Sequence, residues 1–230
     1  MKRPLYGFVM AFVITSVMPV HAQTPYVGVV GGVNFADLNI EFVDKTITDY
    51  DIRSRTLFGV GGFFGIPLNE YLSLQIEPMY LQKGGIYTRT SAPDMHLKSN
   101  QLELPLIVKA GIGEDVRPYI LGGVLMSFVL DASIELEMAG RTWEGDLAQV
   151  LNKTEYGALF GAGMSFPLWK GSTFIECRYA LGLTNLNKGG SLNLTSGSLV
   201  LAGPQTDPGD EIKTKGIQIM VGFQLPLGGE

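Results

Sequence analysis

The chain has few charged residues, one cysteine and two histidines, and each scarcity argues against a class of protein. Charged residues make up 17% of its 230 residues, the net charge is −5 at pH 7 and no basic run occurs, so we expect no nucleic-acid partner. A single cysteine, Cys177, excludes an internal disulfide framework. Because it lies far from the N-terminus, we also expect no lipoprotein anchor.

Catalysis has little support in the sequence. His21 falls in the N-terminal segment, and His96 has no serine or cysteine at a meaningful spacing, so neither a triad nor a zinc site is expected. We therefore predict a protein that is not an enzyme, with no catalytic, cofactor-binding or metal-binding residues.

Long apolar runs are also missing after residue 22. Mean hydropathy is nevertheless high, at +0.20. A helical membrane span needs roughly 18 or more consecutive apolar residues. The apolar residues are instead spread evenly, together with 30 glycines, 12 phenylalanines and 9 tyrosines. This composition is typical of strands with one apolar face, joined by turns.

The N-terminus is predicted to be an export signal. Lys2 and Arg3 precede an apolar stretch over residues 5–20, and Val20-His21-Ala22 places small residues at a cleavage site. We expect residues 1–22 to be a cleaved signal peptide and residues 23–230 to form one domain. A short N-terminal membrane anchor is the alternative interpretation.

Eight segments show the period-2 alternation of strands with two different faces. Segment 100–110 is typical, because Leu102, Leu104 and Leu106 share one face while Glu103 and Lys109 share the other. The segment over residues 117–130 is apolar on both faces, so its orientation stays open. The eight segments cover residues 26–36, 56–66, 72–83, 100–110, 117–130, 155–166, 172–183 and 215–225.

Short and long connections alternate strictly along the chain. The short ones cover residues 67–71, 111–116 and 167–171, and the long ones cover residues 37–55, 84–99, 131–154 and 184–214. Outer-membrane barrels have this asymmetry, with short periplasmic turns and longer external loops. Only a closed barrel pairs every backbone group in hydrocarbon. We therefore predict an all-β, eight-stranded antiparallel transmembrane β-barrel in the bacterial outer membrane, surrounded by lipid.

Two further sets of residues follow from this barrel. Aromatic residues near the strand ends are expected to form two girdles at the membrane surfaces: Tyr71, Tyr80, Tyr119, Tyr156, Trp169 and Tyr179. Charged residues on the polar faces are expected to fill the lumen as a salt-bridge network: Glu77, Glu103, Lys109, Glu176 and Arg178. We hypothesise that Glu77 and Glu103 pair with Lys109 and Arg178. Pro78 and Pro105 are interpreted as local bulges or skipped bonds.

Four of these segments have a distinctive sequence: Gly28-Val29-Val30-Gly31-Gly32-Val33-Asn34-Phe35, Leu74-Gln75-Ile76-Glu77-Pro78-Met79-Tyr80, Leu102-Glu103-Leu104-Pro105-Leu106 and Glu176-Cys177-Arg178-Tyr179. They resemble strands of the Bacteroidetes-type outer-membrane β-barrel proteins known as porin-family or PorT-like. The resemblance covers nearly all of the chain after residue 22. It implies recognition by the barrel insertion machinery, with Phe223 near the C-terminus as the aromatic signal.

Four functions stay open at this point. The first is a non-enzymatic barrel with an envelope role, or one that binds an external partner through residues 131–154 and 184–214. The second is a narrow channel for ions or small solutes, which a filled eight-stranded lumen disfavours. The third is a soluble lipocalin-like barrel with its apolar faces turned inward around a ligand. An enzyme is a distant fourth, and the resemblance leaves a part in protein secretion open.

Overall fold

The computed structural model describes residues 24–44, 50–89 and 92–228. The predicted signal peptide, residues 1–22, lies outside the described residues. Within the described ranges, no helix has the length and apolar character that a membrane-crossing helix needs.

The described chain is built almost entirely of strands. They are β1 (Tyr26–Glu41), β2 (Asp51–Arg53), β3 (Arg55–Pro67), β4 (Leu72–Ile76), β5 (Met79–Arg89), β6 (Ala92–Gly111), β7 (Arg117–Met138), β8 (Arg141–Asp146), β9 (Thr154–Leu168), β10 (Gly171–Gly182), β11 (Gly190–Ser196), β12 (Leu199–Thr206) and β13 (Glu211–Pro226), with the 3₁₀ turn η1 (Leu147–Gln149) after β8. Pairing is antiparallel throughout.

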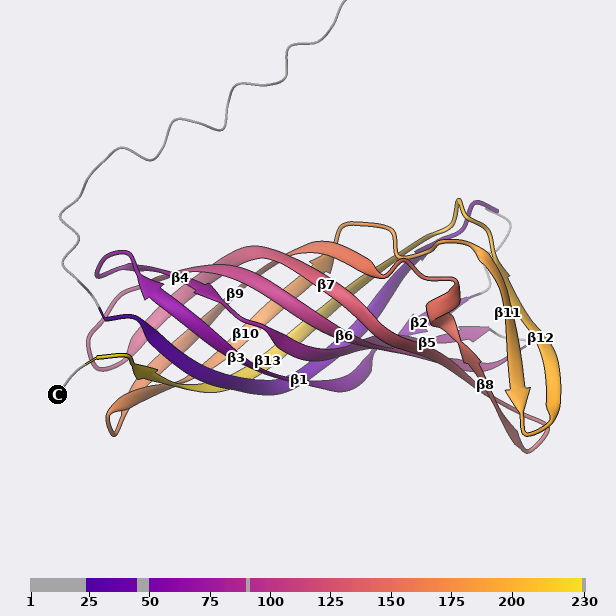
Figure 1. Cartoon of the computed structure of the whole chain (residues 1–230), viewed down its shortest axis with the longest axis horizontal. Coiled ribbons are helices and arrows are strands. Elements are labelled where there is room, and N and C mark those ends of the chain that lie inside the picture. Colours follow the sequence, from indigo (N-terminus) through magenta and orange to yellow (C-terminus); the bar gives the residue numbers. More distant parts are fainter. Residues whose placement is uncertain (1–23, 45–49, 90–91, 229–230) are drawn as a thin grey trace, which may run out of the picture.

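Eight of these strand positions close into a ring (Figure 1). The order around the ring is β1, β3, β4 with β5, β6, β7, β9, β10, β13 and back to β1. The seam is the β1–β13 ladder, which runs from Tyr26 opposite Pro226 to Glu41 opposite Glu211. Both ends of the described chain lie at the end of the barrel that holds the short turns. The predicted eight-stranded antiparallel barrel is therefore confirmed.

Pro78 divides one strand of the ring into β4 and β5. Its missing N–H interrupts the wall between β4 and β5. The register continues unchanged across the gap, with Ile76 opposite Leu106 and Met79 opposite Glu103. The interruption is thus a skipped pairing and not a bulge.

Pro105 lies inside β6 and is tolerated for a similar reason. It stays in register opposite Leu125 of β7. Its carbonyl accepts a hydrogen bond from the Glu77 N–H at 3.1 Å, which bridges the gap beside Pro78. Each proline gives up a donor while the neighbouring backbone remains paired.

The wall has an apolar outside and a largely polar inside. Large apolar side chains such as Val29, Phe64 and Val124 are exposed on the outer face, as lipid contact requires. Buried inward positions include Gln75, Glu103 and many other polar groups. A soluble lipocalin-like barrel would have the opposite arrangement, so that alternative is wrong.

Strand β7 settles the orientation that the sequence left open. Tyr119, Leu121 and Leu125 point into the barrel and are buried, whereas Ile120 and Val124 are more than 60% exposed outside. Because both faces carry apolar side chains, the sequence of this strand held no signal for its phase.

The long connections lie at one end of the barrel, and they consist mostly of strands, which the alternation in the sequence does not predict. The wall strands run on beyond the expected membrane segment, β8 pairs with the far end of β7, and β11 and β12 form a hairpin beside β8 (Figure 1). On the outer surface the apolar band ends at a hydrogen-bonded polar row, in which Gln82 contacts Asn100 and Asn100 contacts Asp131. We call the strands beyond this row, with β2, β8, η1, β11 and β12, the extracellular extension.

The extension has an apolar interior of its own. Buried side chains from β7, β11 and the η1 region pack together there: Ala132, Ile134, Leu136, Leu147, Val150, Leu192 and Leu194. The barrel thus changes polarity along its axis. Within the membrane its interior combines buried charges with packed apolar groups and its exterior is apolar, whereas beyond the membrane it has the apolar interior expected in water.

Candidate functional site

Four charged side chains meet at the middle of the lumen, in what we call the lower cluster. Arg178 of β10 holds Glu77 in a bidentate pair, with Nη1–Oε1 at 2.6 Å and Nη2–Oε2 at 3.0 Å. Its Nε also donates to Glu176 at 2.6 Å. Lys109 of β6 reaches the other oxygen of Glu176, again at 2.6 Å. Two cations therefore balance two carboxylates.

Neutral donors complete the lower cluster. Tyr119 donates its hydroxyl to Glu176 at 2.6 Å, and Gln75 donates to Glu77 at 2.7 Å. Lys109 lies 4.7 Å from the centroid of the Phe174 ring, a cation–π distance. Tyr119 is hence a lumen residue, and its predicted place in an aromatic girdle is wrong.

A second group, the upper cluster, lies nearer the extension. Lys83 of β5 bridges Glu103 at 2.8 Å and Glu155 at 3.1 Å. Ser127 donates to Glu103 at 3.0 Å, and the Thr214 hydroxyl donates to Glu155 at 2.8 Å. One cation here faces two carboxylates, so the formal charge of this cluster is −1.

The structure places the predicted charges in the lumen and forms one of the predicted pairs. Arg178 pairs with Glu77 as expected, whereas Lys109 pairs with Glu176. Glu103 pairs with neither predicted cation, because Lys83 reaches it instead. Within the chain segments seen here, the five predicted residues thus divide between two clusters.

Lys83 and Glu155 are the lumen charges that sequence reasoning did not place in the network. Lys83 shares the polar face of residues 72–83, so the alternation carried a signal for it. Glu155 is one residue before outward-facing Tyr156, which puts it on the inner face. Both are at most 4% exposed.

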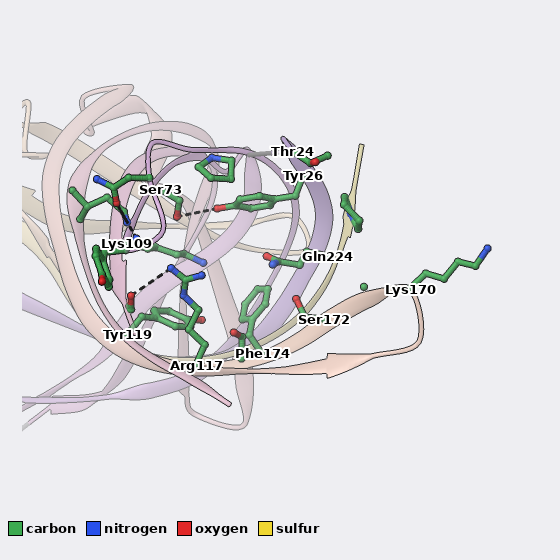
Figure 2. Close-up of a pocket in the computed structure, with 18 residues that line it drawn as sticks. Thr24, Tyr26, Ser73, Lys109, Arg117, Tyr119, Lys170, Ser172, Phe174 and Gln224 are labelled. Atoms are coloured by element: carbon green, nitrogen blue, oxygen red, sulfur yellow. Dashed lines mark hydrogen bonds between the residues drawn. The ribbon is translucent and has the colours of Figure 1, made fainter. Parts of the chain in front are cut away.

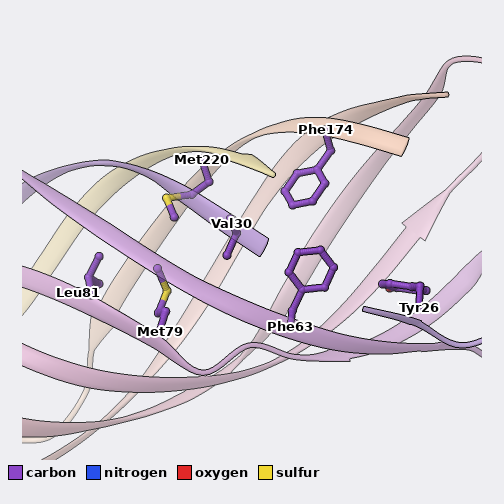
Figure 3. Close-up of a cluster of buried hydrophobic side chains, with 7 residues drawn as sticks. All are labelled: Tyr26, Val30, Phe63, Met79, Leu81, Phe174 and Met220. Atoms are coloured by element: carbon purple, nitrogen blue, oxygen red, sulfur yellow. The ribbon is translucent and has the colours of Figure 1, made fainter. Parts of the chain in front are cut away.

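A cluster of apolar side chains, which we call the apolar plug, adjoins the lower cluster (Figure 3). Phe63 and Phe174 face each other with ring centroids 5.6 Å apart, and Met79, Leu81 and Met220 pack further up the lumen. Charged groups and packed apolar groups together block the membrane-level lumen, as expected for eight strands.

Two cavities lie at opposite ends of this blocked section. The one at the short-turn end has a volume of about 360 Å³ (Figure 2). Lys109, Arg117 and Lys170 are among the described residues lining it, and no carboxylate side chain is. The other cavity, of about 290 Å³, lies inside the extension and has mostly apolar walls.

A model of the family described as "Outer membrane protein beta-barrel domain" matches residues 21–188, more than half of the chain. The chain belongs to this family. It is accordingly an outer-membrane β-barrel protein of a bacterium, and lipid surrounds its apolar band. No curated protein sequence matches it.

Solved outer-membrane proteins have a similar course of strands. OprG from Pseudomonas aeruginosa is 12% identical, with a TM-score of 0.47 over 90% of this chain and 98% of that one. Ail of Yersinia pestis, solved with the heparin analogue sucrose octasulfate, is 12% identical, with a TM-score of 0.41 over 88% and 100%. The outer-membrane protease OmpT from Escherichia coli is 9% identical, with a TM-score of 0.40 over 90% and 98%.

The other predicted girdle residues of this outer-membrane barrel face outward. Tyr71 and Trp169 lie at the short turns and are 53% and 90% exposed. Tyr156 is 54% exposed, and Tyr80 and Tyr179 are half-buried beside the outer rings of Phe58 and Phe160. Their role as membrane-surface girdles stays a prediction.

Cys177 also lies on the lipid-facing side of the outer-membrane barrel, exposed in β10. Over the residues whose placement is described, no group of three or more His, Cys, Asp or Glu side chains is arranged to hold a metal ion.

Proposed function

We propose that this outer-membrane barrel is non-enzymatic, does not conduct, and acts by binding an external partner or ligand at its extracellular extension. The observation that carries the proposal is the contrast along the axis. At membrane level the lumen holds two buried ion clusters and an apolar plug, while the extension projects beyond the polar row with a cavity of its own. Function in such scaffolds concentrates on the parts that a rigid wall presents.

Reconstitution in planar bilayers tests the non-conducting part. We expect no steady open steps from the purified protein, because opening a path would separate Arg178 from Glu77 and Lys83 from Glu103 in a low-dielectric interior. A porin in the same bilayers serves as the positive control. Steady open steps would overturn this part and favour the narrow channel.

Surface labelling tests which end presents the binding surface. In a Cys177→Ser background, Leu199→Cys in the β11–β12 hairpin and Glu114→Cys in a short turn introduce one exposed thiol each. A membrane-impermeant maleimide should label the first on intact cells and the second only after lysis. The reverse result would place the extension in the periplasm and overturn the proposal.

The proposed route to the membrane is export followed by barrel insertion. We propose cleavage after Ala22, which predicts a mature chain beginning at Gln23. Phe223, near the end of the last strand, is the proposed aromatic signal for the insertion machinery. The strand sequences that contain Glu77-Pro78 and Glu103-Leu104-Pro105 support placing the chain with the Bacteroidetes-type, PorT-like barrels. Mass measurement of the protein from outer membranes tests the cleavage.

A further inference from the structure

The cavity of the extension has apolar walls and lies above the membrane. Its lining includes Leu38 and Ile40 of β1, Leu97 of β6, Ile134 of β7 and Val150 after η1. These positions lie beyond the outer polar row, so water and not lipid surrounds the wall that carries them. An apolar space enclosed by a wall that stands in water favours an apolar guest.

The floor of this cavity is polar, and its polar side chains already have ion-pair or hydrogen-bond partners. Lys83, which lines it, is held by Glu103 and Glu155, and Thr214 is hydrogen-bonded to Glu155. These groups have their partners and offer little to a second polar group from above. A guest therefore cannot place a charged head at the floor without breaking an ion pair, and its polar end must face the rim.

The rim carries aromatic rings and a cation. Phe42, Tyr50 and Tyr87 form a ring cluster, with centroids 5.2 to 6.4 Å apart. Arg89 lines the cavity and is exposed, so the space reaches solvent there. Within the described ranges no carboxylate lies in salt-bridge distance of Arg89. The one carboxylate lining the described part of the cavity, Asp210, accepts hydrogen bonds from the backbone N–H groups of Val43 and Asp207. Arg89 is thus free to bind an anionic head group at the rim.

We infer that the extension binds a single-chain amphiphile with an anionic head, of the fatty-acid class, with its chain inside the cavity and its carboxylate at Arg89. The inference rests on the proposed binding role of the extension and names the ligand class. A volume of about 290 Å³ is just below the ~300–1,000 Å³ usual for small-molecule sites. One alkyl chain suits this space better than a two-chain lipid.

The experiment uses the full mature chain in phospholipid nanodiscs, without alkyl detergent, titrated with dodecanoate. The chain has two tryptophans, and Trp143 packs against the apolar cluster of the extension. A Trp169→Phe background therefore leaves one reporter near the site. We expect saturable fluorescence change, with affinity rising about fourfold per methylene from octanoate to dodecanoate. Empty nanodiscs correct for partition into lipid.

Two kinds of variant test the location. Ala132→Phe fills the cavity from β7 and should abolish binding, whereas Val124→Phe on the lipid face of the same strand should not. Leu38→Phe fills the space from β1 without adding a second tryptophan, so the test does not depend on one variant folding. Heat-modifiable migration on gels confirms that each variant retains a barrel.

A third variant tests the head group. Arg89→Gln should weaken dodecanoate about two- to fivefold and leave dodecanol unchanged, since an exposed ion pair contributes little more. Arg141→Gln, at the exposed β7–β8 turn, is the matched control.

The outcomes separate the inference from the proposed function. The inference would be overturned if dodecanoate showed no saturable binding, or if both cavity-filling variants bound it with the affinity of the parent protein. Either result would count even if the barrel does not conduct. Equal affinity for dodecanoate and dodecyltrimethylammonium would overturn the anionic head group. Steady conductance would overturn the proposed function whatever the titration gives.

Discussion

Arg178 and Glu77, 101 residues apart in the chain, meet across the lumen in a bidentate pair with both side chains fully buried. Glu77 lies in the gap that Pro78 leaves between β4 and β5, and Arg178 lies in the middle of β10. The pair links opposite sides of the barrel wall, so it braces the cross-section in which the lumen is blocked.

Removing one partner of this pair should be costly. Arg178→Met leaves Glu77 and part of Glu176 buried without their main cation, and we expect a loss of about 3–5 kcal/mol in the free energy of unfolding. Urea unfolding in detergent micelles, followed by heat-modifiable migration, measures it. Glu77→Met combined with Arg178→Met should recover part of the loss, because no carboxylate is then left buried at position 77 without its cation. Additive losses in the double variant would contradict a direct pair.

Substitutions of the cation and of one carboxylate in the upper cluster should lower the free energy of unfolding by different amounts. Lys83→Met leaves the Glu103 and Glu155 carboxylates facing each other, and should cost about 3–5 kcal/mol. Glu103→Gln leaves Lys83 paired with Glu155 and keeps an acceptor for Ser127, so it should cost no more than about 1 kcal/mol. Equal losses in the same unfolding assay would mean that the surplus carboxylate is needed for another reason.

A close ion pair in the extension should matter far less. Lys213 lies 2.5 Å from Glu211, and its hydrogen bond to that carboxylate raises the pKa of Lys213. Because the pKa of Lys213 is raised in the folded protein, the ion pair stabilises the fold at every pH below the ordinary lysine pKa. This stabilisation is lost only when the pH rises through the raised pKa. Lys213→Met should leave the unfolding midpoint unchanged at neutral pH, because solvent screens the pair. A midpoint shift matching that of Arg178→Met would show that burial is not the deciding factor.

Gly182 makes room for the upper cluster. A Cβ at this position would lie 2.0 Å from Oε1 of Glu155, so Gly182→Ala must displace that carboxylate from Lys83 and Thr214. We expect a loss of about 1–3 kcal/mol. Gly62→Ala is the matched control, since a Cβ there meets nothing closer than 3.5 Å. Comparable unfolding of both variants would argue that strand glycines act through backbone freedom alone.

Alternation along single strands was enough to predict the ring and its faces. Glu103 and Lys109 were placed inside, and Leu102 and Leu106 outside, because side chains in a strand point to alternate faces. Tyr119 was misplaced because its strand is apolar on both faces. Turn lengths gave the direction of the barrel, since short and long connections fall at opposite ends.

The pairing of the lumen charges could not be predicted in the same way. Which cation reaches Glu103 depends on the heights at which β5 and β6 stand in the closed barrel, and no single strand encodes its own height. The extension was missed for a different reason. Ala132, Ile134 and Leu136 do alternate with polar residues, but their phase shifts at the irregularity near Val129 and Asp131.

The β1–β13 ladder has a consequence for the order of folding. Its register is continuous from Tyr26 to Glu41. The first and last strands of the described wall therefore pair over both the membrane segment and part of the extension. Contacts between such distant parts of a chain form slowly. The wall cannot close until its last strand is in place, and the cavity above the membrane comes into existence in that same final step. A chain shortened within β13 should therefore lose the sealed lumen and the cavity together.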